Sequence, residues 1–144
     1  MKRLIIAITL ILLAASLFAL KLFLPASNPM SEQQKEAVFA VVGESTHDFK
    51  TIKEADGPVT HTFKIKNEGK APLVITNVTA SCGCTSPDWT KQPIAPGKIG
   101  EVKVTYDPAG RPNPFSRPVA VYSNGHKGSY NLTIKGNVEA KKIQ

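Results

Sequence analysis

From residue 38 onward, hydrophobic and polar residues alternate along the chain, which is typical of β-strands with one buried and one solvated face. The stretch 59–67 shows this most clearly, because Val59, Phe63 and Ile65 share one side of it. The other side is polar and consists of Thr60, Thr62, Lys64 and Lys66. The pattern predicts a strand over these residues.

Similar segments recur about every ten residues, separated by turn signals such as Pro96-Gly97 and Asn124-Gly125. The stretch 73–80 has Leu73 and Ile75 on one side and, on the other, Val74, Val78 and Ala80. The last strand is expected to point these residues inward: Tyr130, Leu132, Ile134 and Val138. With further strands at 38–42, 101–106 and 117–123, six segments are recognisable, and a total of six or seven short strands predicts an all-β sandwich over 38–140.

The N-terminal segment has a different pattern, with an apolar run from Leu4 to Leu20 after Lys2 and Arg3. A secretory signal core is about 7–15 residues long and a membrane-spanning helix needs roughly 20, so this length fits either a cleaved signal or a single transmembrane anchor over 1–24. A polar linker over 25–37 follows. Because positive residues stay on the cytoplasmic side, the remainder is predicted to be exported to the periplasmic side of a bacterial envelope.

Charge and composition limit the functions to consider. The 144 residues carry a net charge of +7, which falls to +4 once Lys2, Arg3 and Lys21 leave with the first 24 residues. The remaining lysines are spread singly without interleaved aromatic residues, so nucleic-acid binding is not expected. Neither a nucleophile elbow nor paired carboxylates at catalytic spacing occur, which favours a protein that is not an enzyme.

The two cysteines of the chain, Cys82 and Cys84, are separated only by Gly83. In an extended strand their α-carbons would lie about 6.6 Å apart, at the limit of the roughly 4.4–6.8 Å that a disulfide tolerates, so a disulfide needs a bend that glycine permits. Three interpretations stay open: a structural plug at a strand end, a redox-active thiol pair, or a soft-metal site, chiefly for Cu(I). The candidate third ligands for copper are His47, His61, His126 and Met30.

Three other residues have more ordinary interpretations. His61 shares its side of the strand with Val59 and Phe63, so a half-buried sheet residue is expected. Asp48 before Phe49 is interpreted as a turn residue. Trp89 is interpreted as a loop residue that covers the edge of the core.

Several blocks of the sequence together resemble one family. They are His47-Asp48-Phe49, the stretches 63–69 and 71–75, Ser81-Cys82-Gly83-Cys84-Thr85, Trp89, the stretches 94–97, 110–112 and 123–124, and the stretch 134–138. The chain resembles the bacterial exported domain-of-unknown-function family with the Ser-Cys-Gly-Cys-Thr hallmark. The resemblance covers about 38–138 and implies an Ig-like sandwich similar to the Hydin and major-sperm-protein domains, with no established activity.

Two residues depart from the pattern of this family. Lys50 and Asn113 stand where the family usually has glycine, which puts the local turn geometry in question. The function expected from the whole is a non-catalytic interaction or scaffolding module at the cell envelope, acting through its sheet edges or the predicted loop 81–96. The alternative is a thiol-redox or copper-handling protein that acts through Cys82 and Cys84.

Overall fold

The structure, a computed structural model, describes residues 36–142, and this part of the chain forms eight strands and one short 3-10 helix. The helix, η1, spans Glu54–Asp56. The strands are β1 (Phe39–Val42), β2 (Thr46–Lys53), β3 (Val59–Asn67), β4 (Ile75–Ala80), β5 (Thr85–Trp89), β6 (Ile99–Tyr106), β7 (Asn113–Ser123) and β8 (Ser129–Glu139). Within residues 36–142 no helix has the length and apolarity needed to cross a membrane. The predicted signal or anchor over 1–24 and most of the predicted linker lie outside the described residues.

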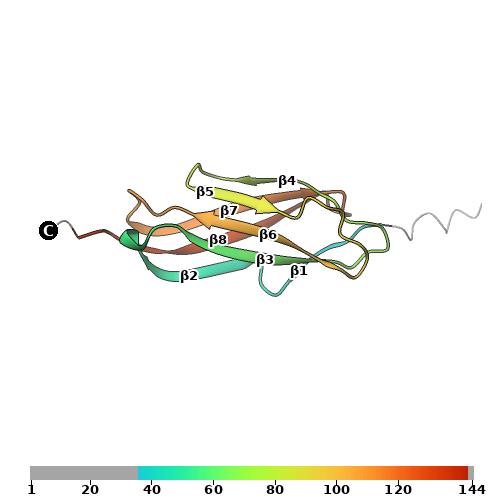
Figure 1. The fold of residues 1–144 in the computed structure, drawn as a ribbon, viewed down its shortest axis with the longest axis horizontal. Coiled ribbons are helices and arrows are strands. Elements are labelled where there is room, and N and C mark those ends of the chain that lie inside the picture. Colours follow the sequence, from blue (N-terminus) through green and yellow to red (C-terminus); the bar gives the residue numbers. More distant parts are fainter. Residues whose placement is uncertain (1–35, 143–144) are drawn as a thin grey trace, which may run out of the picture. The chain divides into compact units, whose positions relative to one another are not determined.

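The strands form two four-stranded sheets that pack face to face (Figure 1). One sheet has the order β1-β3-β6-β5 and the other the order β2-β8-β7-β4. Neighbouring strands are antiparallel except β2 and β8, which run parallel. The predicted all-β sandwich is confirmed, with eight strands where six or seven were expected.

The core lies between the sheets and consists of the inward residues of the alternating strands. On β3, Phe63 and Ile65 are buried as predicted, and on β8 so are Leu132 and Ile134, whereas Tyr130 is half-buried. Each fully buried aliphatic side chain contributes about 1.5–3 kcal/mol to folding, so the regular alternation that reveals these strands also stabilises them.

The predicted sides of β4 are wrong. Ile75 and Val78 are both buried, although they are three positions apart and would face opposite sides of a regular strand. Val74, which was expected on the side of Val78, is only half-buried. The cause is a β-bulge, because Ile75 pairs with Ser123 and Asn77 with the preceding Tyr122. The extra residue inverts the alternation at this point.

Two strands, β2 and β5, lack a clear alternating pattern and escaped prediction. β5 lies inside the predicted loop 81–96 and contains Pro87 and Asp88, which disfavour strands but are tolerated at a sheet edge. β2 is interrupted by an irregularity between Asp48 and Thr51. The predicted turn role of Asp48 is partly right, because it lies in β2 but its carboxylate accepts the Lys50 N–H at 2.8 Å within that irregularity.

At positions 50 and 113 this chain has a residue other than the glycine usual in the family that it resembles, and both positions have the backbone conformation that glycine favours. Lys50 has a φ of 59° and Asn113 a φ of 108°. A side chain with a Cβ is strained there, although asparagine tolerates the left-handed region better than lysine does.

A buried asparagine fastens one end of the sandwich. Asn67 is fully buried at the end of β3, and its Oδ1 accepts the N–H groups of Val38 at 3.3 Å and Gly69 at 2.9 Å. Its Nδ2 donates to the carbonyls of Ala71 and Ile94, both at 2.8 Å. One side chain therefore connects β1, the β3–β4 turn and the segment before β6.

Candidate functional site

The two cysteines lie where the chain crosses from one sheet to the other. β4 ends in the second sheet at Ala80, and β5 begins in the first at Thr85. Cys82 and Cys84 form a disulfide across this crossover, with α-carbons 5.3 Å apart. This distance is shorter than the about 6.6 Å of an extended strand, so the bend expected from the sequence is present.

The backbone around the disulfide is well anchored. Thr85 N–H donates to the Cys82 carbonyl at 3.2 Å, and Asp107 N–H to the Cys84 carbonyl at 2.8 Å. Ser81 N–H donates to the Pro118 carbonyl at 3.3 Å, so the β4–β7 ladder continues one residue beyond β4. These bonds hold the disulfide between β6 and β7.

The two sulfur atoms differ in exposure and share one polar neighbour. The Cys84 residue is only 6% exposed, whereas Cys82 is half-buried. The hydroxyl Oγ1 of the buried Thr85 lies 3.5 Å from Cys82 Sγ and 3.7 Å from Cys84 Sγ. The last residue of the Cys-Gly-Cys-Thr stretch therefore places a hydrogen-bond donor against both sulfurs.

Gly83 forms the exposed tip of the crossover. Its φ lies outside the left-handed region, and a Cβ built on it would meet no heavy atom within 4 Å. Neither backbone conformation nor packing in this domain therefore requires glycine here.

Sequence reasoning missed Arg117, which faces inward near the disulfide. Arg117 has the same orientation on β7 as the buried Phe115 and Val119, and it is half-buried. The β4–β7 register pairs Ala80 with Val119, so continuing it places Cys82 across from Arg117. The sequence does indicate this orientation, because Arg117 lies two positions before Val119 and therefore on the same side of the predicted strand. A cationic residue at the start of a predicted strand is, however, usually interpreted as exposed to solvent.

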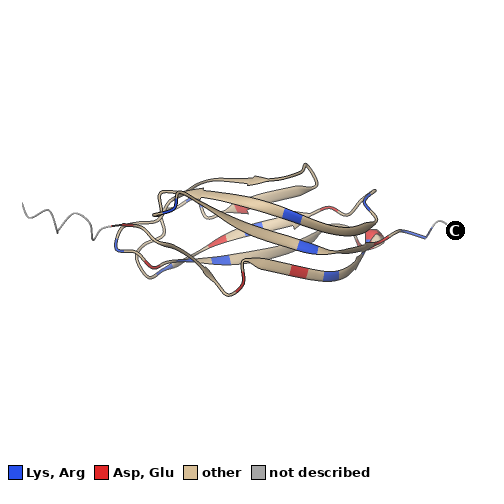
Figure 2. Ribbon diagram, turned by 180° about the vertical axis from the view of Figure 1, so that it is seen from behind, with Lys and Arg blue, Asp and Glu red and all other residues tan. Residues whose placement is uncertain are grey.

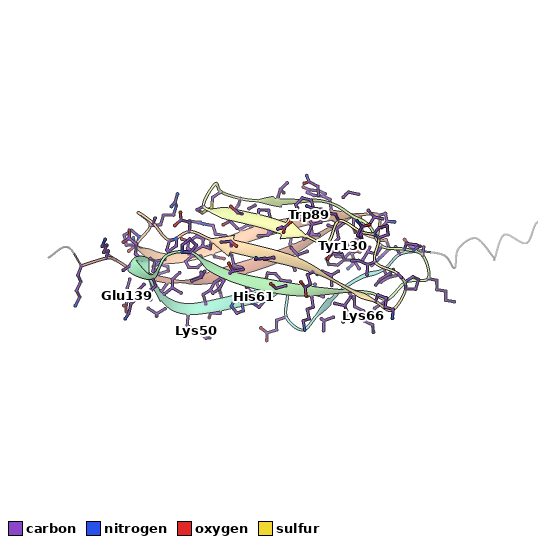
Figure 3. The ribbon with its side chains drawn as sticks, in the orientation of Figure 1. Lys50, His61, Lys66, Trp89, Tyr130 and Glu139 are labelled. Atoms are coloured by element: carbon purple, nitrogen blue, oxygen red, sulfur yellow. A yellow bond between two sulfur atoms is a disulfide. The ribbon has the colours of Figure 1, made fainter. Side chains whose placement is uncertain are left out.

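The predicted histidine ligands divide into two places. His47 of β2 and His61 of β3 stack at 3.6 Å between ring centroids and join the two sheets at one edge, with Phe49 and Phe63 at either end of the pair. Figure 3 shows His61 midway along the sandwich. Burial, and then the neighbouring His47, lower the pKa of His61 below its ordinary value.

The structure does not assemble a metal site from the predicted ligands. His126 lies at the β7–β8 turn, where its Nδ1 is 3.1 Å from the Tyr130 hydroxyl, and Met30 lies outside the described residues. Within residues 36–142, no group of three or more His, Cys, Asp or Glu side chains could hold a metal ion.

Trp89 is the last residue of β5 rather than a loop residue, because β5 pairs with β6 up to Trp89 and Val102. It does cover the core edge as expected, since it is half-buried and its Nε1–H donates to the Ile75 carbonyl of β4 at 3.2 Å. The Lys91 ammonium lies over the indole ring of Trp89, which is labelled in Figure 3.

The outward amides of β5 are occupied within the chain. On β5, Thr85 N–H donates to Cys82, Pro87 has no N–H, and Trp89 N–H donates to Asp88 Oδ1 at 2.9 Å. On the β4 edge, Val78 N–H donates to the side chain of Asn77 at 2.9 Å. Such devices prevent another strand from pairing with an edge.

The edge of β1 is different. Glu68 N–H bonds to the Val38 carbonyl, so the alternating pattern directs the backbone groups of Phe39 and Val41 away from β3. Among the described residues these groups have no hydrogen-bond partner. One exposed hydrophobic residue lies on this edge strand, Val42 at 47% exposure, and a second, Ile99 at 55%, lies on β6 beyond β3.

Charged residues of both signs are scattered along the strands and turns (Figure 2). On the outer face beside β1, Lys64 is opposite Val42, and Lys66 is opposite Ile99. Figure 3 shows Lys66 near the end of β3. The open edge is therefore bordered by apolar and basic side chains.

Comparison with solved structures supports the fold. A protein of unknown function from Porphyromonas gingivalis W83 matches with a TM-score of 0.63 and 17% identity, over 77% of this chain and 51% of that one. A PapD-like (ASH) domain of human CEP192 matches with a TM-score of 0.58 and 9% identity, over 83% and 97%. The Vibrio cholerae VesB protease matches with a TM-score of 0.53 and 17% identity, over 76% and 33%. At such identities the likeness shows the fold alone, an Ig-like sandwich of the PapD type.

No curated protein compared with the chain matches it. The chain spans about half the length of the Porphyromonas protein. A family model described as a protein of unknown function, DUF1573, matches residues 40–138, which is most of the chain and all of the sandwich except its outermost residues. The chain therefore belongs to the DUF1573 family.

Proposed function

We propose that this protein is an exported, membrane-tethered Ig-like module with a non-catalytic interaction role at the cell envelope, and that it binds an extended segment of a partner protein along β1. The apolar run 4–20 supports the tether and the export. The contrast between β1 and β5 supports the docking: the outward amides of β5 are occupied within the chain, whereas, among the described residues, the amides of Phe39 and Val41 face outward without a partner.

The border of β1 defines the partner segment. An added strand gains main-chain hydrogen bonds, and its alternate side chains meet the outer face of the sheet. There it would lie beside Val42, with Lys64 and Lys66 one strand further in. The segment that fits best carries apolar and acidic side chains on one side.

Photo-crosslinking tests this proposal. A photoreactive amino acid at position 42 of the full chain, expressed in its own host, is expected to form an adduct with one envelope protein. The matched control is position 122, since Tyr122 is a comparably exposed hydrophobic residue on the other sheet, at 42% exposure. A reporter fused to the C-terminus that is active only outside the cytoplasm tests export separately.

Two proline variants identify the edge. Val41→Pro removes an outward amide from β1, where an edge strand tolerates proline, and is expected to abolish the adduct. Ala80→Pro is the matched change on β4 and should leave the adduct intact. An adduct that survives Val41→Pro, or that forms equally from position 122, would refute docking along β1.

A further inference from the structure

The disulfide contributes little to the stability of the fold. Its cysteines are two positions apart in sequence, so the bond closes a very small ring and restrains little of the unfolded chain. The crossover is already held by backbone hydrogen bonds from Ser81, Thr85 and Asp107. A stabilising role therefore does not explain a bond placed here.

The disulfide is also open to attack from one direction. Cys82 is half-buried, whereas Cys84 is only 6% exposed. An incoming thiolate therefore meets the Cys82 sulfur first, and Cys84 becomes the leaving group. Exchange through a leaving thiolate is faster when that thiolate is stabilised.

The Thr85 hydroxyl is placed to stabilise the leaving Cys84 thiolate, and Arg117 faces the crossover on the side of Cys82. The Thr85 hydroxyl lies 3.7 Å from Cys84 Sγ and can donate a hydrogen bond to it. Continuing the β4–β7 register beyond its last pair, Ala80 and Val119, places Arg117 across from Cys82, the thiolate that the second exchange step releases. A guanidinium beside a thiol lowers the thiol pKa.

The environment of Arg117 is otherwise unexplained. Its Nε is buried and has no hydrogen-bond partner among the described residues, although it faces the inside of the sandwich. Within residues 36–142 the salt bridges involve lysines, and none includes Arg117. The Nη1 of Arg117 donates to the Ser116 carbonyl at 3.5 Å, so among the described residues the guanidinium has a neutral partner but no anionic one. A half-buried cation without a counter-charge is costly, and a thiolate at the crossover would supply the missing negative charge.

We propose that Cys82–Cys84 is a thiol–disulfide exchange site that accepts two electrons from a dithiol of a partner protein. A partner thiolate attacks Cys82 Sγ, forming a mixed disulfide, while the bond between Cys82 and Cys84 breaks and its electron pair stays on Cys84 Sγ. The second partner thiolate then attacks the partner sulfur of the mixed disulfide and releases Cys82 as a thiolate, which takes a proton from water. The partner dithiol is oxidised to a disulfide, and this chain is reduced to two thiols.

This inference does not depend on docking along β1. The crossover adjoins the end of β6 at Tyr106, whereas β1 pairs with residues 64–67 at the other end of β3. Loss of exchange and loss of the crosslinked adduct are separate measurements, so either proposal can fail alone.

The test measures reduction of the folded full chain, purified in a mild detergent, with dithiothreitol as the dithiol probe. We expect reduction without denaturant, and we expect the more acidic thiol of the reduced protein to titrate below the ordinary cysteine pKa of about 8.5, read from thiolate absorbance. Arg117→Gln should slow reduction about three- to tenfold and raise that thiol pKa. Arg111→Gln, at an exposed arginine of the β6–β7 turn, is the matched control and should change neither.

Two more variants keep the test decisive if Arg117→Gln does not fold. Thr85→Val retains the side-chain shape without the hydroxyl and should slow reduction severalfold, with Thr85→Ser restoring it. The proposal is overturned if dithiothreitol reduces the disulfide only after urea unfolds the domain, or if the wild-type thiol pKa is ordinary and Thr85→Val reacts at the wild-type rate.

Discussion

Replacing Lys50 by glycine should stabilise this domain. The φ of 59° at Lys50 costs a residue with a Cβ roughly 1–2 kcal/mol, while glycine loses about 0.5–1 kcal/mol more backbone entropy on folding. The Lys50 side chain is 81% exposed, and its ion pair with Asp48 lies at the surface, so little else is lost. The hydrogen bond from the residue 50 N–H to the Asp48 carboxylate remains possible in the variant.

The net expectation for Lys50→Gly is a gain of about 1 kcal/mol in the free energy of unfolding, or a rise of roughly 4 °C in Tm. Urea titration and thermal unfolding both measure it. Lys50→Ala separates the causes, because alanine also removes the ammonium but keeps the Cβ, and it should give no gain.

A second lysine provides the matched control. Lys64 is exposed in the extended backbone of β3, so Lys64→Gly should lower stability by about 0.5–1 kcal/mol. If Lys50→Gly destabilises the domain as much as Lys64→Gly does, the strain assigned to position 50 is absent and the reasoning fails.

Three further predictions concern buried contacts, glycine positions and pH. Asn67→Ala leaves several buried backbone groups without partners and should lower the unfolding free energy by about 3 kcal/mol in urea titrations; a loss below about 1 kcal/mol would contradict the role of Asn67 as a hub. Gly136→Ala should lower Tm because its Cβ would lie 2.9 Å from Phe115 Cε1, whereas Gly83→Ala should leave Tm unchanged, and the opposite order would be incompatible with the packing described. Because the pKa of His61 is lowered in the folded state, the unfolded chain binds a proton at His61 at a higher pH than the folded chain does. Stability should therefore be full above the ordinary pKa of 6.5 and decline below it, a slope that His61→Gln should reduce and that chemical unfolding at several pH values can measure.

The fold was predictable where one face of a strand is buried and the other is exposed to solvent. β3 and β8 satisfy that condition along most of their length, so their bounds and inward residues follow from the alternation. β5 was not predictable in this way, because its edge position tolerates Pro87 and Asp88. The bulge in β4 depends on its pairing with β7, which no local pattern encodes.

The candidate site was predictable only in its covalent part. The two cysteines separated only by Gly83 are visible in the sequence, and their spacing allows a disulfide if the chain bends. The proximity of Arg117 depends on the register between two strands separated by more than thirty residues. The stacking of His47 on His61 depends on the packing of one sheet against the other.

The chain enters the described domain at one end of the sandwich and leaves it at the other (Figure 1). A pulling force applied between the two ends of the described domain would therefore act along the strands. β1 runs antiparallel to β3, and its hydrogen bonds lie across that direction, so they would be loaded together in shear rather than opened one after another. This geometry suits a module that must resist mechanical tension.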